Sequence, residues 1–288
     1  MNTIEKYRRY VNTNAVKKVQ PIVIDRAEGV RVWDENGREY LDLFSGISVV
    51  NAGHCHPEVI EAAAAQMRRL IHSNSYLYHN RPVADFAEAL ASVMPSPELR
   101  VSFFGNSGAE AIEGAMRLAK QYTGRSEFVA LEMSFHGRTV ATLSVSGNWR
   151  RKKKGGPYLP GVAFAAVPYP YRSPFGSDPE TCARECAAAV ERVIDLHTSG
   201  DVAAFIAEPV LGEGGIIVPP PRYFQLVKEI LDRRGILFLC DEVQTGFVRT
   251  GRMLAIERYG VVPDIVVTAK GIADGFPLSA FTTREEIA

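Results

Sequence analysis

Short apolar segments alternate with amphipathic segments along most of the chain beyond residue 100. Runs of apolar, often β-branched residues predict buried strands, and apolar residues spaced three and four apart predict helices. The predicted strands are 100–104, 127–131, 203–208, 236–240 and 264–269, and the predicted helices are 108–121, 179–196 and 221–234. Strands that alternate with helices indicate an α/β domain with a mainly parallel sheet flanked by helices.

The beginning of the chain has a different pattern. Residues 22–43, IVIDRAEGVRVWDENGREYLDL, alternate apolar and polar side chains around two turn signals, Glu28-Gly29 and Asn36-Gly37. This pattern predicts short strands joined by turns. From Pro57 the spacing becomes helical, as PEVIEAAAAQMRRLI shows.

Composition and charge exclude several classes of protein. Lysine plus arginine balance aspartate plus glutamate at 33 each, so the net charge provides no general attraction to nucleic acid or anionic membranes. No apolar run approaches the length of a transmembrane helix, and the polar start MNTIEKYRRY is not typical of a signal peptide. With only four cysteines in 288 residues, we expect a cytoplasmic protein without nucleic-acid or membrane partners.

Two other features have alternative interpretations. Cys182 and Cys186 lie four apart on a predicted helix and could begin a metal site, but no matching ligand pair follows, so we expect ordinary packing and no metal. The basic run RRKKK (150–154) could bind anions or nucleic acid, but it is short, and we expect a solvated loop.

Parallel sheets bind ligands at the carboxyl ends of their strands, so the residues that follow each predicted strand matter most. After 100–104, the residues Ser107, Gly108 and Ala109 begin a predicted helix. Backbone N–H groups and a hydroxyl at a helix N-terminus form an anion site, although the serine is equally consistent with an ordinary helix cap.

Three more strands end in polar residues. After 127–131, His136 offers a ring for stacking and Arg138 a fork for a carboxylate, although a lone histidine is more often structural. Glu208 ends the strand 203–208, and Glu213 follows in glycine-rich chain that is also consistent with a solvated turn. Five apolar residues precede Asp241, whose carboxylate would be costly to bury without a cation.

The last strand leads directly to a lysine. In DIVVTAKG the apolar run 264–269 ends at Lys270, whose ammonium loses hydration in such a setting. An anion site, a stacking ring, a buried carboxylate and an apolar lysine together match pyridoxal 5′-phosphate. The anion site would bind the phosphate, and the stacking ring would lie on the ring face. The carboxylate would face the protonated pyridine nitrogen, and the lysine would bond the aldehyde.

Five motifs carry a family resemblance. The chain resembles the class III aminotransferases, the pyridoxal-phosphate enzymes of fold type I, through the motifs NSGAEAIEGAMRLAK, FHGRT, EPVLGEGG, DEVQTGFVRTG and AKGIADGFP, in order and in register. The stretch 45–62 resembles their N-terminal signature as well. The resemblance implies an N-terminal segment over 1–56 that is part of a small domain, and a cofactor-binding large domain over 57–288.

The resemblance also implies residue roles. Lys270 would hold the cofactor covalently and serve as the catalytic base, and desolvation would lower its pKa. The implied cofactor-binding residues are Ser107, Gly108, Ala109, His136, Glu208, Asp241, Val243, Gln244 and Lys270, and the implied substrate-binding residues are Arg138, Glu213 and Ile47. In particular, Val243 would pack on the ring face opposite His136, and Gln244 would approach the ring hydroxyl.

Arg138 and Glu213 together favour the 4-aminobutyrate branch. In that branch the arginine binds the substrate carboxylate, and the glutamate pairs with a C-terminal arginine until a dicarboxylate must be held. The resemblance therefore implies an enzyme that transfers an amino group to an oxo acid such as 2-oxoglutarate. Ornithine, acetylornithine and alanine–glyoxylate aminotransferases remain alternatives, as do a racemase, aminomutase or decarboxylase and a catalytically inactive chain.

The sequence departs from the family pattern in three places. Val248 and Asp274 stand where relatives often have glycine. Relatives also continue well beyond residue 288, so we expect a chain truncated at its carboxyl end, without the C-terminal small domain. The resemblance implies a homodimer with active sites at the subunit interface.

Overall fold

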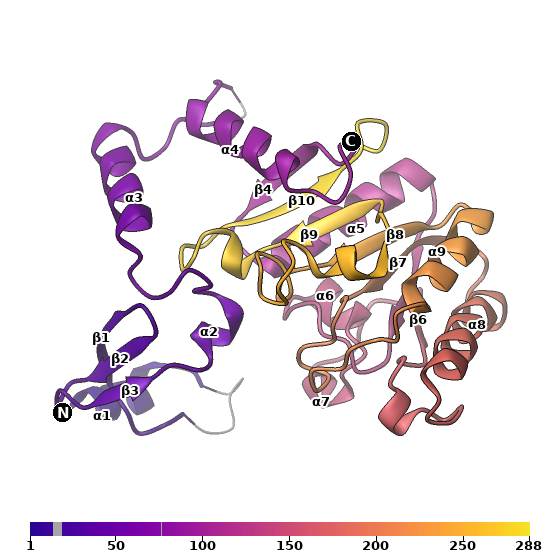
Figure 1. The fold of residues 1–288 in the computed structure, drawn as a ribbon, viewed down its shortest axis with the longest axis horizontal. Helices are drawn as coiled ribbons and strands as arrows, with labels where there is room; N and C mark the ends of the chain where they lie inside the picture. Colours follow the sequence, from indigo (N-terminus) through magenta and orange to yellow (C-terminus); the bar gives the residue numbers. More distant parts are fainter. Residues whose placement is uncertain (14–18, 76) are drawn as a thin grey trace. The chain divides into compact units, whose positions relative to one another are not determined.

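The computed structural model describes residues 1–13, 19–75 and 77–288 (Figure 1). The chain divides into two compact units, Met1–His72 and Ser73–Ala288. The division falls after the helix that begins at Pro57, whereas the sequence predicts a domain boundary between residues 56 and 57. The domain assignment itself stays a prediction, and each unit is described separately below.

The first unit contains the predicted short strands and the helix that follows them. Its elements are α1 (Thr3–Tyr10), β1 (Ile24–Glu28), β2 (Arg31–Asp34), β3 (Glu39–Leu41), α2 (Ser45–Ser48) and α3 (Pro57–Arg69). The strands form an antiparallel sheet in the order β1-β2-β3. Gly29 and Gly37 take φ values of +54° and +80° at the turns that the sequence predicts, a conformation that glycine adopts without strain.

The second unit is an α/β domain. Its elements are α4 (Arg81–Ser92), β4 (Val101–Gly105), α5 (Gly108–Thr123), β5 (Glu127–Leu131), α6 (Val140–Val145), α7 (Trp149–Lys152), β6 (Val162–Ala165), η1 (Pro170–Arg172), α8 (Pro179–His197), β7 (Val202–Ala207), α9 (Tyr223–Arg234), β8 (Leu237–Asp241), η2 (Ala255–Tyr259), β9 (Ile265–Thr268), η3 (Lys270–Ile272) and β10 (Ser279–Thr283). All five predicted strands are present, with ends within one residue of the prediction, and the three predicted helices within two.

Seven strands of this unit form one mixed sheet in the order β4-β10-β9-β8-β7-β5-β6. The pairs from β9 to β6 are parallel, whereas β10 is antiparallel to both β9 and β4. Because β10 reverses between them, β4 runs in the same direction as β9. The predicted α/β fold with a mainly parallel sheet is therefore confirmed, with β6 and β10 as additional strands.

Helices cover both faces of the sheet (Figure 1). Side chains of successive strand residues point to opposite faces, so Phe205 of β7 packs in the cluster with α8 and α9, whereas Ile206 packs in the cluster with α5. Every residue of β7 is buried, as expected for a central parallel strand. Cys182 and Cys186 lie in the α8 cluster as buried thiols 3.9 Å apart.

The sheet brings the polar strand ends to one edge. The strands β4, β5, β7, β8 and β9 all run in one direction, so their carboxyl ends lie together. The chain enters the antiparallel β10 at this same edge. Among the residues that the structure describes, no helix is long and apolar enough to cross a membrane.

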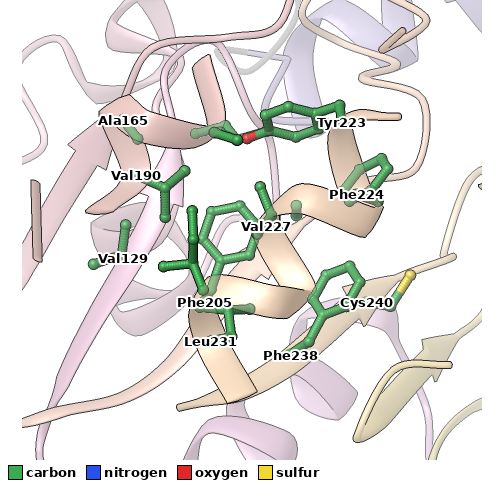
Figure 2. Packing of buried hydrophobic residues seen from close by; sticks show 14 of the residues in the cluster. Val129, Ala165, Val190, Phe205, Tyr223, Phe224, Val227, Leu231, Phe238 and Cys240 are labelled. Atoms are coloured by element: carbon green, nitrogen blue, oxygen red, sulfur yellow. The ribbon is translucent and has the colours of Figure 1, made fainter. Parts of the chain in front are cut away.

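One buried tyrosine provides a test of this core. Tyr223, at the start of α9, is fully buried, and its hydroxyl has no hydrogen-bond partner among the described residues (Figure 2). Burial of an unpartnered hydroxyl costs about 1–3 kcal/mol. We therefore expect Tyr223→Phe to raise the free energy of unfolding by about 1 kcal/mol, measured by urea denaturation.

Tyr259 supplies the matched control, because it packs in the same cluster and donates its hydroxyl hydrogen to the carbonyl oxygen of Pro209 at 3.0 Å. Tyr259→Phe removes a hydrogen bond and should destabilise the protein by about 1 kcal/mol. Equal destabilisation by the two variants would contradict the assignment of an unpartnered Tyr223 hydroxyl.

Candidate active site

The carboxyl edge of the sheet holds a pocket of about 380 Å³. All predicted cofactor-binding residues line it, together with Arg138. The residues that the prediction did not include are Asn106, Phe135, Gly137, Ala269, Phe276, Pro277 and Leu278. Glu213 is not among the lining residues, and Ile47 belongs to the first unit, so the pocket is described without either of them.

The N-terminus of α5 forms one wall of the pocket. Ser107 caps the helix, and its Oγ accepts a hydrogen bond from the backbone N–H of Glu110 at 3.2 Å. The first N–H groups of a helix have no acceptor within it, so they are available to an anion. A side chain at Gly108 would come within 2.9 Å of Val243, so only glycine allows this close approach.

A buried ion pair lies at the base of the pocket. Asp241, the last residue of β8, is 3 % exposed, and its Oδ2 lies 2.7 Å from Nδ1 of His136. Its Oδ1 accepts the backbone N–H of Val243 at 3.0 Å. Burial by itself would lower the pKa of His136, but the Asp241 carboxylate and the nearby Glu208 charge outweigh it, and the pKa is raised. The Asp241 carboxylate therefore stabilises the charged form of His136.

The other ring nitrogen of His136 has no partner. His136 is 3 % exposed, and its Nε2 is buried without a hydrogen bond to any described residue. Buried polar groups are nearly always hydrogen-bonded, so each exception requires an explanation. His136 also lines the pocket, so its ring borders the space in which a group would bind.

Glu208 joins two loops of the site. It directly follows β7, and its carboxylate oxygens accept the backbone N–H groups of Phe135 at 3.0 Å and Gly212 at 2.9 Å. Burial raises its pKa to about 7, although the His136 charge and the two N–H donors act in the opposite direction. The loops after β5 and β7 are therefore held together by one buried carboxyl group.

Lys270 follows β9 and faces the same pocket. Burial lowers the pKa of its amine, opposed by the carboxylates of Asp241, Glu208 and Glu213. The Nζ lies 3.5 Å from Oε1 of Gln244. The backbone of Lys270 has a φ of +51°, a region that non-glycine residues occupy at a cost. The structure thus combines a desolvated amine with a constrained backbone.

Glu213 lies outside the pocket lining and pairs with a residue that the sequence did not single out. Its two carboxylate oxygens accept hydrogen bonds from Nη2 of Arg151 at 3.0 and 2.7 Å. Arg151 belongs to α7 and to the basic run that the sequence predicts as a solvated loop. The contact joins positions 62 residues apart, so no local pattern in the sequence reveals it.

The family follows from a match along nearly the whole chain. The model of the family "Aminotransferase class-III" matches residues 12–288. The chain belongs to this family. The family that the motifs predict is therefore confirmed by sequence and by fold.

Several curated relatives are similar to this class-III chain. An alanine–glyoxylate aminotransferase 2 homologue, named as mitochondrial, from Arabidopsis thaliana is 46 % identical over 89 % of the chain and 52 % of the relative. An acetylornithine aminotransferase from Methanosarcina mazei is 42 % identical over 100 % and 66 %. A 4-aminobutyrate aminotransferase from Escherichia coli is 37 % identical over 94 % and 63 %. The chain therefore spans about half to two thirds of the length of these relatives.

Solved structures share the fold. An omega-transaminase from Thermomicrobium roseum has a TM-score of 0.91 and 35 % identity over 100 % of this chain and 67 % of its own. An amine transaminase from an uncultivated Pseudomonas species, solved with pyridoxal phosphate bound, has a TM-score of 0.89 and 36 % identity over 96 % and 64 %. The fold type I assignment is confirmed, whereas the relatives do not single out the 4-aminobutyrate branch.

Class-III aminotransferases depend on pyridoxal phosphate, and the pocket residues fit this cofactor. The buried Nε2 of His136 has no partner among the described residues, and Gly108 and Ala109 at the N-terminus of α5 line the same pocket. A carboxylate suits a protonated ring nitrogen, an amine can bond an aldehyde, and a helix N-terminus suits a phosphate. All of these groups belong to the second unit.

The loop beside the pocket holds a strained residue that can be tested. Val248 has a φ of +69° and a side chain that is 57 % exposed. A β-branched residue in this region is an outlier, at a cost of about 1–2 kcal/mol. We expect Val248→Gly to raise the free energy of unfolding by about 1 kcal/mol, measured by chemical denaturation.

Asp274 is the control for this substitution, with a φ of +46°. Aspartate tolerates the left-handed region better than valine, so Asp274→Gly should change stability by much less. If Val248→Gly destabilised the protein, or if the two variants behaved alike, strain at Val248 would not be the explanation.

Burial of Glu242 predicts how the free energy of unfolding depends on pH. Glu242 is fully buried, and its carboxylate accepts the N–H of Ile256 at 2.8 Å and a hydrogen bond from the Thr245 hydroxyl. Burial raises its pKa from 4.5 to about 7. The folded protein therefore binds this proton more tightly than the unfolded chain, and the group's contribution to stability falls as pH rises from about 4.5 to 7.

Glu242→Gln removes this pH dependence. One pKa unit corresponds to about 1.4 kcal/mol, so the variant's stability relative to the parent should rise by up to about 3 kcal/mol between pH 5 and pH 8. Urea denaturation of both proteins across this range measures the difference. A relative stability independent of pH would show that the Glu242 pKa is not raised.

Proposed function

We propose that this protein transfers an amino group from an amino acid or ω-amino acid to an oxo acid such as 2-oxoglutarate, with pyridoxal phosphate as its cofactor. The observation that carries the proposal is the convergence of Lys270, Asp241 and the N-terminus of α5 on one pocket. When bound, the cofactor supplies an aldehyde that exchanges amines and a ring that withdraws electrons. Side chains and backbone groups of the protein bind and orient the cofactor and the substrate and move the proton.

Binding uses groups of three kinds. The N–H groups of Gly108 and Ala109 and the hydroxyl of Ser107 would hold the phosphate at the end of α5. The Asp241 carboxylate would keep a proton on the ring nitrogen, and its orientation is fixed by His136 and by the N–H of Val243. A protonated ring nitrogen increases the electron demand of the ring.

The ring faces and the ring hydroxyl have their own partners. As the family resemblance implies, His136 would lie on one face of the ring and Val243 on the other, and Gln244 would approach the hydroxyl. Glu208 supports this arrangement by holding the loop of His136 against the glycine-rich segment that begins at Gly212.

Lys270 carries the proton transfer. Its Nζ would hold the cofactor through the aldehyde group. When free, the same amine would accept and return the proton of the amino-bearing carbon of the substrate. Because burial lowers the pKa of this amine, a larger fraction of it is neutral and able to accept a proton.

We favour 4-aminobutyrate as the donor. Arg138 lines the pocket as a cation suited to a substrate carboxylate. The chain has both Arg138 and Glu213, the combination that the resemblance to the 4-aminobutyrate branch implies. Ile47, in the first unit, is the third proposed substrate contact. Ornithine, acetylornithine and alanine are the competing donors, and relatives named for acetylornithine and alanine–glyoxylate transfer are at least as similar.

We also propose that the active protein is a homodimer, as the family resemblance implies. Sedimentation of the cofactor-loaded protein distinguishes a dimer from a monomer. This proposal does not affect the assignment of the pocket residues, which all belong to one chain.

Covalent attachment tests the function directly. With pyridoxal phosphate, the protein should develop a visible absorbance, and borohydride should fix the cofactor to Lys270, located by peptide mass spectrometry. Lys270→Ala should lose the fixed label, because no other amine of the pocket replaces it among the lining residues. Lys152→Ala is the matched control, since burial also lowers the pKa of that lysine, which lies outside the pocket lining.

The controls separate the alternatives. A colourless protein after incubation with the cofactor would contradict the proposal and favour a catalytically inactive chain. A labelled protein can then be mixed with 4-aminobutyrate, ornithine, acetylornithine or alanine, and loss of the visible absorbance identifies the donor. Racemisation without loss of the amino group would point to the racemase alternative.

A further inference from the structure

The hydroxyl of Ser146 links the end of α6 to the loop of His136, and the proposed function gives it no role. Ser146 directly follows α6 and is fully buried. Its Oγ accepts the backbone N–H of His136 at 2.8 Å and donates to the carbonyl oxygen of Thr142 at 2.7 Å. One side chain therefore joins the last turn of α6 to a loop residue ten positions earlier.

Two successive N–H groups of the loop after β5 are bound by buried side chains. The N–H of Phe135 donates to Glu208 at 3.0 Å, and the N–H of His136 donates to Ser146 at 2.8 Å. Glu208 and Ser146 are 4 % and 0 % exposed, so bulk water does not compete for either bond. The backbone of His136 is therefore held in one position, and the position of its ring follows from that of its backbone.

The ring of His136 transmits this constraint to Asp241. Its Nδ1 lies 2.7 Å from Oδ2 of Asp241, and both side chains are buried. Such a bond depends steeply on distance and angle, and it is stronger when one partner is charged. The other oxygen of Asp241 accepts the N–H of Val243 at 3.0 Å. The backbone position of His136 therefore determines one of these two interactions that orient the Asp241 carboxylate.

Removal of the Ser146 hydroxyl would leave the N–H of His136 buried without its acceptor. Such groups are rare in folded proteins, because they lose their hydrogen bond to water and gain none in return. The loop can relieve this cost only by moving, and the ring of His136 moves with its backbone. The consequence would be seen at Asp241, which lines the pocket, although Ser146 itself is not among the lining residues.

We propose that Ser146 is a positioning residue, whose hydroxyl fixes His136 and, through His136, orients the Asp241 carboxylate toward the ring nitrogen of the cofactor. This inference rests on the proposed function and adds a residue to it. Ser146 acts at a distance from the cofactor, so its removal should affect the contact with the ring nitrogen and spare the contacts with the phosphate. The two kinds of contact can be separated by a change in the cofactor itself.

Cofactor binding tests the proposal without turnover. Equilibrium dialysis against the cofactor-free protein gives dissociation constants for pyridoxal phosphate and for its analogue with a carbon in place of the ring nitrogen. The analogue lacks the atom that Asp241 would face. Ser146→Ala should therefore weaken the binding of pyridoxal phosphate about tenfold and leave the binding of the analogue nearly unchanged.

Ser144 supplies the matched control on the same helix. It is 2 % exposed, donates to the carbonyl oxygen of Val140 at 2.7 Å and accepts the N–H of Leu159 at 3.0 Å. Like Ser146, it thus bonds a carbonyl four residues earlier and one N–H of a loop, but Leu159 does not line the pocket. Ser144→Ala should lower the free energy of unfolding about as much as Ser146→Ala, measured by urea denaturation, and leave the binding of both compounds unchanged.

Ser146→Cys decides the question if Ser146→Ala does not fold. A thiol is close to a hydroxyl in size and is a weaker acceptor, so this variant should weaken the binding of pyridoxal phosphate more than that of the analogue. Equal weakening of both compounds, or the same effect from Ser144→Ala, would show a purely structural role and the inference would be wrong. Unchanged binding of pyridoxal phosphate to the Ser146 variants would also overturn it.

The proposed function stands in each of these contrary cases, because the parent protein still binds pyridoxal phosphate. Failure of the proposed function is seen separately and earlier, as a parent protein that binds no pyridoxal phosphate.

Discussion

Burial of the Asp241 carboxylate at the carboxyl end of β8 is the constraint on which the rest of the site depends. An ionised carboxylate at 3 % exposure is tolerated only with charged or hydrogen-bonding partners. His136 supplies one from the loop after β5, and the N–H of Val243 supplies another from the loop after β8. Two loops from different strands are thereby held at one point of the sheet edge.

Two neighbouring carboxyl groups, those of Glu208 and Glu242, also join segments of the chain around the site. Glu208 joins the loops after β5 and β7 through two backbone N–H groups, and Glu242 ties the start of the loop after β8 to η2. In both groups burial raises the pKa to about 7, whereas burial lowers the pKa of the Lys270 amine. One physical cause, loss of hydration, therefore moves acids and the base toward the neutral range. Proton transfer near neutral pH benefits from such matched groups.

Backbone strain accompanies the site. Lys270 at the pocket and Val248 in an adjacent loop both occupy the left-handed region. Such residues persist where the surrounding structure determines the conformation, and they gather at functional sites. At Lys270 the strained residue is the one proposed to react, whereas at Val248 the strain comes from a β-branched side chain in the left-handed region.

The sequence by itself determined the architecture and the chemistry of the pocket. Apolar runs located five strands of the sheet, and the polar residues directly after them, such as Ser107, Asp241 and Lys270, are the ones that meet in the pocket. This worked because parallel strands bring their carboxyl ends to one edge, so position along the chain implies position in space. The order of the motifs then identified the family and its cofactor.

Only the tertiary structure decided the contacts between distant residues. The strands β6 (Val162–Ala165) and β10 (Ser279–Thr283) are short or partly polar, and their place depends on the strands beside them. The partners of His136 and Glu213 lie 105 and 62 residues away, and no local pattern encodes such pairs. Local preferences act over a few residues, whereas the pairing of buried charges is settled by which loops the packed sheet brings together.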